Sequence, residues 1–161
     1  MPIAMLLVGV ACDGNTPTED ARSVSIDDLV FAGSVSQADG EFQGELAISQ
    51  PAGATQPLRI EFMSTCALAL LVHDVGQMAE PRWDQQRWQN EQPGGCKPVE
   101  NPVDVPATGA LTLRTQPADG TSILGDSLLA GAYATAIRIH VTRPADTVLV
   151  VPSGVVGISV H

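Results

Sequence analysis

The stretch that decides the fold is residues 133–142, YATAIRIHVT. In it Ile137, Ile139 and Val141 recur at every second position, with smaller or polar side chains between them. A period of two is typical of a β-strand with one face toward a core, because successive side chains point to opposite sides of a sheet. The stretch therefore predicts a long strand, half buried along its length.

Shorter segments on both sides have the same character. Residues 29–35 and 42–49 are expected to form two strands joined by a hairpin at Asp39-Gly40, since Asp-Gly favours tight turns. Further strands are expected at residues 58–62, 67–72, 110–115, 147–151 and 155–160. The apolar run ALALLV at 67–72 favours a central strand. We therefore expect an all-β fold, an immunoglobulin-like antiparallel β-sandwich of about eight strands with no convincing helix.

The charge balance excludes several classes of partner. Eight Lys and Arg residues against 18 Asp and Glu residues give a formal net charge of −10, and Lys97 is the only lysine. Nucleic acids and anionic membrane surfaces need clustered cations, so no nucleic acid partner and no polybasic membrane contact are expected. With 44% hydrophobic and only 16% charged residues, the chain is also unlike a disordered acidic tail.

The N-terminus has the pattern of a targeting segment. Residues 3–11 (IAMLLVGVA) are too few to span a bilayer as a helix and fit the hydrophobic part of a secretory signal. Because Cys12 follows directly, the segment resembles the lipobox of bacterial lipoproteins, whose cysteine is acylated. We expect a signal peptide at 1–11, a flexible tether at 12–28 and the sandwich at 29–161, exported to the bacterial cell envelope and anchored by the lipid. The alternative is a short buried strand with a buried thiol.

The cysteine count is consistent with export. An odd cysteine in an exported protein needs an explanation, and acylation of Cys12 supplies one for three cysteines. Export places Cys66 and Cys96 in an oxidising compartment, so we predict a disulfide between them. It would close a loop of about 31 residues and stabilise the domain by about 3–4 kcal/mol. Two unrelated free thiols are the alternative, and a tetrahedral metal site would need more ligands.

The polar stretch 75–102 holds the most distinctive local feature, since Arg82-Trp83 and Arg87-Trp88 repeat at a spacing of five. Arginine beside tryptophan is typical of interaction hot spots. These four residues are therefore the candidate partner-binding site. Trp83 could instead cap the core near the disulfide, whereas Trp88 is expected to be partly exposed.

No set of residues points to catalysis, a metal or a cofactor. His73-Asp74 and His140 are expected on strands, with the histidines on outer faces, solvated or at the edge of the core. The sequence contains no nucleophile elbow, zinc-ligand pattern or phosphate-binding glycine loop. Its Asp-Gly pairs are expected to be plain turns rather than calcium loops. We therefore expect a protein that is not an enzyme.

Three motifs carry a resemblance to a known family. They are Phe62-x-Ser64-x-Cys66 followed by Val72-His73-Asp74-Val75-Gly76 and Trp83, the turn Val105-Pro106-Ala107-Thr108-Gly109, and Leu129-Ala130-Gly131-Ala132-Tyr133. In this order they resemble the BsuPI-type intracellular proteinase inhibitor domain over residues 42–142. The resemblance implies a small immunoglobulin-like sandwich of a kind that also occurs in envelope lipoproteins. Gly131 is expected to adopt a positive φ in the turn before its strand.

The functional prediction is a non-enzymatic, lipid-anchored envelope protein, monomeric, that binds a protein partner. Inhibition of a protease is what the resemblance implies, by steric blocking with a rigid loop within residues 75–102. Two alternatives stay open: a carbohydrate-binding module that stacks sugars on Trp83 and Trp88, and a structural component of the envelope. Two coplanar exposed tryptophans would favour carbohydrate, whereas a buried Trp83 and a protruding loop would favour a protein.

Overall fold

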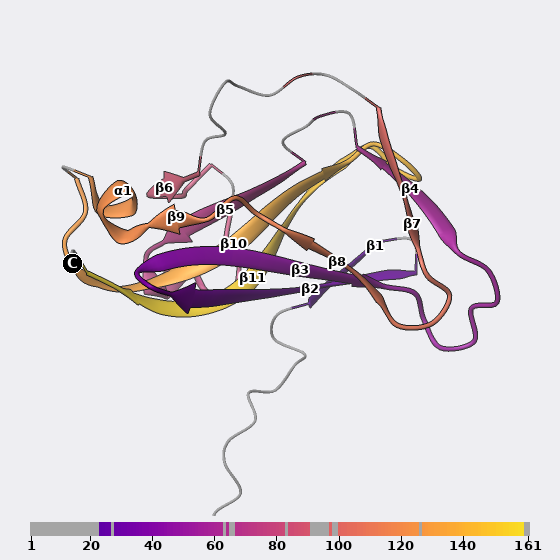
Figure 1. The fold of residues 1–161 in the computed structure, drawn as a ribbon, viewed down its shortest axis with the longest axis horizontal. Coiled ribbons are helices and arrows are strands. Elements are labelled where there is room, and N and C mark those ends of the chain that lie inside the picture. The colour runs from indigo at the N-terminus through magenta and orange to yellow at the C-terminus, as the bar shows by residue number, and fades with distance from the viewer. Residues whose placement is uncertain are drawn as a thin grey trace, which may run out of the picture.

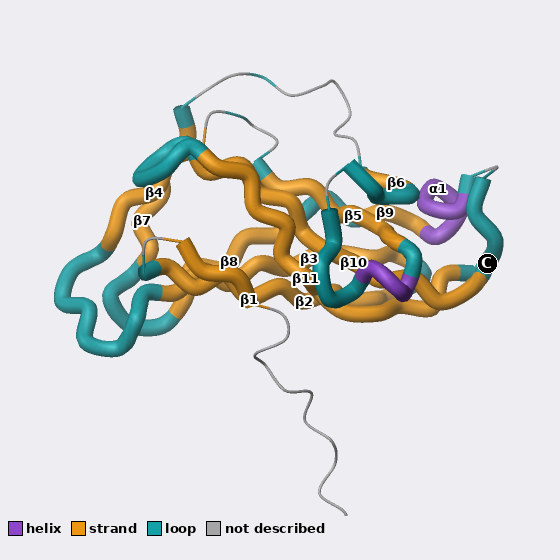
Figure 2. Tube along the Cα trace, turned by 180° about the vertical axis from the view of Figure 1, so that it is seen from behind, coloured by secondary structure: helices purple, strands orange, loops and turns teal. Residues whose placement is uncertain are grey.

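The computed structural model describes residues 23–26, 28–62, 64, 67–82, 84–90, 97, 100–125 and 127–159. Two antiparallel sheets pack face to face, and a small two-stranded sheet extends them at one end (Figure 1). Strands make up the body of the domain, and the helical turns are short (Figure 2). The predicted all-β sandwich is confirmed.

The first sheet has the strand order β1-β2-β3-β8. Its members are β1 (Ser23–Ile26), β2 (Leu29–Ala38), β3 (Glu41–Ser49) and β8 (Ala110–Arg114), and the short β9 (Ala118–Asp119) pairs with the start of β3. The β2–β3 hairpin turns at Asp39 and Gly40, which adopt φ values of 52° and 82°. Two successive positive φ values are what a type I′ turn requires, so the predicted hairpin is confirmed.

The second sheet has the strand order β11-β10-β5-β6. Its members are β5 (Leu68–His73), β6 (Trp88–Gln89), β10 (Gly131–Val141) and β11 (Thr147–Ile158). Because β5 pairs with both β10 and β6, it is an inner strand, as the apolar run predicted. The remaining pair, β4 (Leu58–Phe62) and β7 (Asn101–Val105), lies at the opposite end of the sandwich from β6 and β9 (Figure 1).

The main core lies between the two large sheets. Ile137, Ile139 and Val141 of β10 are fully buried in it, as their alternation predicted. They pack with buried side chains from strands of all three sheets: Leu29, Phe31, Leu46, Ile48, Ile60, Phe62, Val105 and Val151. A second cluster fills the end beside α1 (Gly120–Leu124) and contains Phe42, Leu70, Val72, Ala118, Ile123, Leu124 and Ile158.

Two strands lie where the sequence analysis expected irregular chain. Residues 23–26 were assigned to the tether, but they form β1, which pairs with β2 and starts the first sheet. β7 was missed because Pro102 and the charged Asp104 obscure the alternation of Val103 and Val105. The pairing of β7 with β4 turns Val105 into the core.

Three local expectations were wrong. The two strands expected at residues 147–151 and 155–160 are one strand, β11, which pairs with β10 along its length. The Asp119-Gly120 pair was expected to be a plain turn and no helix was expected, but β9 and α1 meet there, and the Asp119 side chain caps the helix by accepting a hydrogen bond from the Ser122 N–H at 2.7 Å. Gly131 was expected at a positive φ, but it is the first residue of β10 and lies outside the left-handed region. A Cβ built on Gly131 would meet nothing closer than 4.0 Å.

Candidate functional site

The four residues predicted to bind a partner are divided between two surfaces. Arg82 and Arg87 are exposed on the segment that leads from β5 to β6. Trp88 belongs to β6 and packs partly against the core cluster beside α1, so it is partly exposed as expected. Trp83 lies outside the described residues.

Residues 74–87, here called the strap, return the chain from β5 to β6 and begin with the 3-10 turn η2 (Val75–Gln77). The strap is tied to the sheet at several points. The Arg87 N–H donates to the Val72 carbonyl at 2.7 Å, and the His73 Nε2 lies 2.9 Å from the Arg82 carbonyl. Within the strap, the Gln77 Nε2 donates to the Gln85 Oε1 at 3.1 Å. These bonds tie the strap to the end of β5 and its two arms to each other.

His73 corrects one expectation of the sequence analysis. The sequence placed it on an outer face, solvated or at the edge of the core, but it is fully buried. It does alternate to the outer side of β5, opposite Ala134 of β10. There the strap covers it, and the Arg82 carbonyl accepts a hydrogen bond from Nε2, while Nδ1 has no partner among the described residues. Burial of His73 is therefore a consequence of where the strap lies.

The exposed side of the strap is mixed in character. Val75 and Met78 are 46% and 38% exposed. Near them in the chain, the Arg82 guanidinium forms a forked pair with Asp84, with N–O distances of 3.1 and 3.2 Å. The strap thus presents apolar side chains beside charges that are already oriented.

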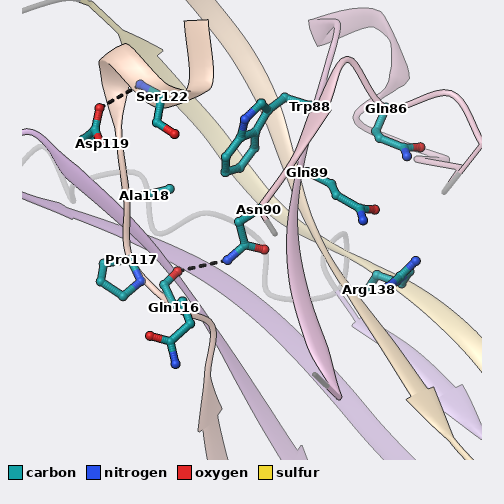
Figure 3. Close-up of a pocket in the computed structure, with 10 residues that line it drawn as sticks. All are labelled: Gln86, Trp88, Gln89, Asn90, Gln116, Pro117, Ala118, Asp119, Ser122 and Arg138. Carbon is teal, nitrogen blue, oxygen red and sulfur yellow. Dashed lines mark hydrogen bonds between the residues drawn. The ribbon is translucent and has the colours of Figure 1, made fainter. Parts of the chain in front are cut away.

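A groove of about 880 Å³ opens at the edge of the sandwich, between β6 and the segment that carries β9 (Figure 3). Asn90 joins the two sides of this edge. Its Oδ1 accepts from the Leu70 N–H at 2.7 Å, and its Nδ2 donates to the Gln116 carbonyl at 3.1 Å. The side chain is buried, so this bridge fixes the two walls relative to each other.

The groove is lined mainly by uncharged polar side chains around one aromatic ring. In Figure 3, Asp119 and Ser122 lie on one side of Trp88, and Gln86 and Arg138 lie on the other. Arg138 reaches the groove from β10, and it is half-buried. The arrangement provides donors and acceptors beside a flat apolar surface, which suits a polar organic ligand.

Of the two histidines that the structure describes, His73 and His140, neither lies in a recognisable catalytic set. The His140 Nε2 lies 2.7 Å from the Asp146 Oδ1 on exposed surface, away from the buried His73 on the same sheet. In the part of the chain that the structure describes, no group of three or more His, Cys, Asp or Glu side chains could hold a metal. None of its helices is long and apolar enough to cross a membrane. The acylation of Cys12 and the disulfide between Cys66 and Cys96 fall outside the described residues and stay predictions.

Comparison with known proteins adds no relative, since neither a family model nor a curated protein matches the chain. The functional argument therefore rests on the strap and the groove. The sequence analysis found the strap through its arginines. It missed the groove because residues 86–90 and 116–122 approach each other only after the two sheets have packed.

Proposed function

We propose that the chain is a non-enzymatic binding protein of the bacterial cell envelope, and that the strap is its contact surface for a protein partner. The observation that carries the proposal is an exposed segment held by hydrogen bonds to the sheet while Val75 and Met78 face solvent. A segment that is ordered before binding loses little conformational freedom when it binds. Methionine and arginine are also enriched at protein interfaces.

A protease is the partner that the resemblance to the BsuPI-type domain implies. The motif Val72-His73-Asp74-Val75-Gly76 covers the buried end of β5 and the first three residues of the strap, so the family-like residues lead directly into the exposed segment. In this proposal the strap fills a protease cleft as a rigid obstacle and contributes no catalytic group. Acylation of Cys12 would leave residues 12–22 as the link between the membrane and β1.

The test is an inhibition assay of the mature chain against serine, cysteine and metallo-proteases, together with capture of partners from envelope extracts. Replacing both Arg82 and Arg87 by alanine should weaken inhibition or capture by about tenfold or more. Arg114→Ala is the matched control, since the Arg114 Nε also pairs with a carboxylate, Glu45, at 2.9 Å, but on β8 of the other sheet.

Two results would count against the proposal. If no protease is inhibited, the protease interpretation is wrong and a different protein partner must account for any capture. If the double variant captures the same partners as the Arg114→Ala control, the strap is not the contact surface.

A further inference from the structure

The groove beside β6 contains polar groups whose bonding capacity is not used within the domain. Gln89 and Arg138 are half-buried, yet neither side chain has a hydrogen bond or an ion pair within the described part of the chain. The Gln86 Oε1 is buried and likewise has no partner there. Buried polar atoms are normally paired, so the Gln86 Oε1 is open to an external donor, and the half-exposed Gln89 and Arg138 side chains are available beside it.

Other groups in the groove are already fixed in place. The Asn90 amide is held by its two bonds, and one Asp119 oxygen is held by the Ser122 N–H. The second Asp119 oxygen is left as an acceptor. Trp88 rests on the core cluster beside α1 and lines the groove with its ring. The site therefore needs little reorganisation to receive a ligand.

We propose that this groove binds a short oligosaccharide. A sugar ring offers an apolar face of C–H groups for Trp88 and many hydroxyls that both donate and accept. Side-chain amides such as those of Gln86 and Gln89 also donate and accept, so they match hydroxyls in either direction. The volume of about 880 Å³ lies in the range of small-ligand sites.

Arg138 makes the ligand class more specific. A guanidinium only donates, and its fork matches the two oxygens of a carboxylate. Arg138 lacks such a partner within the described residues, although the chain as a whole is strongly acidic. We therefore assign the end of the groove at Arg138 to an acidic sugar unit, such as a uronic acid. This second site adjoins the strap, which contributes Gln86 to the groove, but Arg82 and Arg87 do not line it.

The test uses the mature chain on immobilised oligosaccharides of two to four units that contain uronic or N-acetylneuraminic acid. Each is paired with its neutral methyl ester, and acidic tripeptides form a further arm. We expect the acidic saccharides to bind about tenfold or more tightly than their esters, because a charge-assisted hydrogen bond is lost on esterification. Tripeptide binding without saccharide binding would overturn the proposal, as would the absence of saccharide binding in the millimolar range.

Variants separate the roles of the lining residues. Arg138→Gln should remove the preference for acid over ester while the ester still binds, and Gln89→Ala should weaken both. Arg114→Gln removes an exposed arginine elsewhere and should change neither. An unaltered acid preference in Arg138→Gln would overturn the assignment, provided that its urea midpoint matches the wild type. The strap variants Arg82→Ala and Arg87→Ala should bind saccharide normally, so failure of one proposal is distinguishable from failure of the other.

Discussion

We predict that Asn90→Ala destabilises the domain. The Asn90 side chain makes two hydrogen bonds, and losing the one to Leu70 should cost more than losing the one to Gln116. Removing the amide leaves the Leu70 N–H, in an inner strand, without its acceptor at 2.7 Å. A buried donor that loses its partner costs about 1–3 kcal/mol. The Gln116 carbonyl would keep a hydrogen-bond partner, because it also accepts from the Thr115 hydroxyl at 3.1 Å. We therefore expect a loss of about 2 kcal/mol in the free energy of unfolding, nearly all of it at Leu70.

The measurement is urea unfolding followed by circular dichroism. With an m-value of about 2 kcal/mol/M, the midpoint of Asn90→Ala should fall by about 1 M. Gln89→Ala is the control, since the neighbouring side chain has no hydrogen-bond partner in the described residues and should change stability by less than about 0.5 kcal/mol. Equal midpoints for the two variants would refute the idea that Asn90 locks the edge of the sandwich.

Three further predictions use other parts of the chain. Gly33→Ala should lower the melting temperature, because its Cβ would lie 2.6 Å from a backbone oxygen of β11. Gly131→Ala has open space around its Cβ and should melt near the wild-type temperature, so equal melting temperatures for the two variants would contradict this reasoning. Cys66→Ser should lower stability by about 3–4 kcal/mol under oxidising conditions if the disulfide with Cys96 forms, and an unchanged melting temperature would rule the disulfide out. Radiolabelled palmitate should enter the wild type and not Cys12→Ala, so equal labelling would exclude lipidation.

The parts of the fold that the sequence predicted are those set by neighbouring residues. Asp39-Gly40 supplies the two positive φ values of the hairpin turn locally, so the turn and its register could be expected before the structure. The alternation of Ile137 and Ile139 likewise fixes which face of β10 meets the core. Both signals depend only on residues that are close together in the chain, so they can be read from the sequence alone.

The parts that the sequence did not predict depend on contacts between distant residues. His73 follows an apolar run and precedes Asp74, so its sequence is typical of the exposed end of a strand. It is buried because the strap folds back over β5 and brings the carbonyl of Arg82, nine residues further along the chain, against its ring. The Asn90 bridge to Gln116 joins residues 26 positions apart and is equally invisible in local patterns. From the sequence alone, an amide side chain in a polar stretch is expected to lie in a solvent-exposed loop.

The short strand β6 lies between the core cluster beside α1 and the groove, so it contributes to both. Trp88 stands opposite Val72, whose side chain lies in the core, and Gln89 stands opposite Leu71, which packs with Ala136 on the other face. Because successive residues of a strand point to opposite sides, Gln89 lines the groove from the outer face of the sheet, whereas Trp88 packs on the core cluster beside α1 and also borders the groove. Substitution of Trp88 would therefore disturb packing and ligand contacts together. Gln89 and Arg138 are the positions where binding can be altered while the sandwich stays intact.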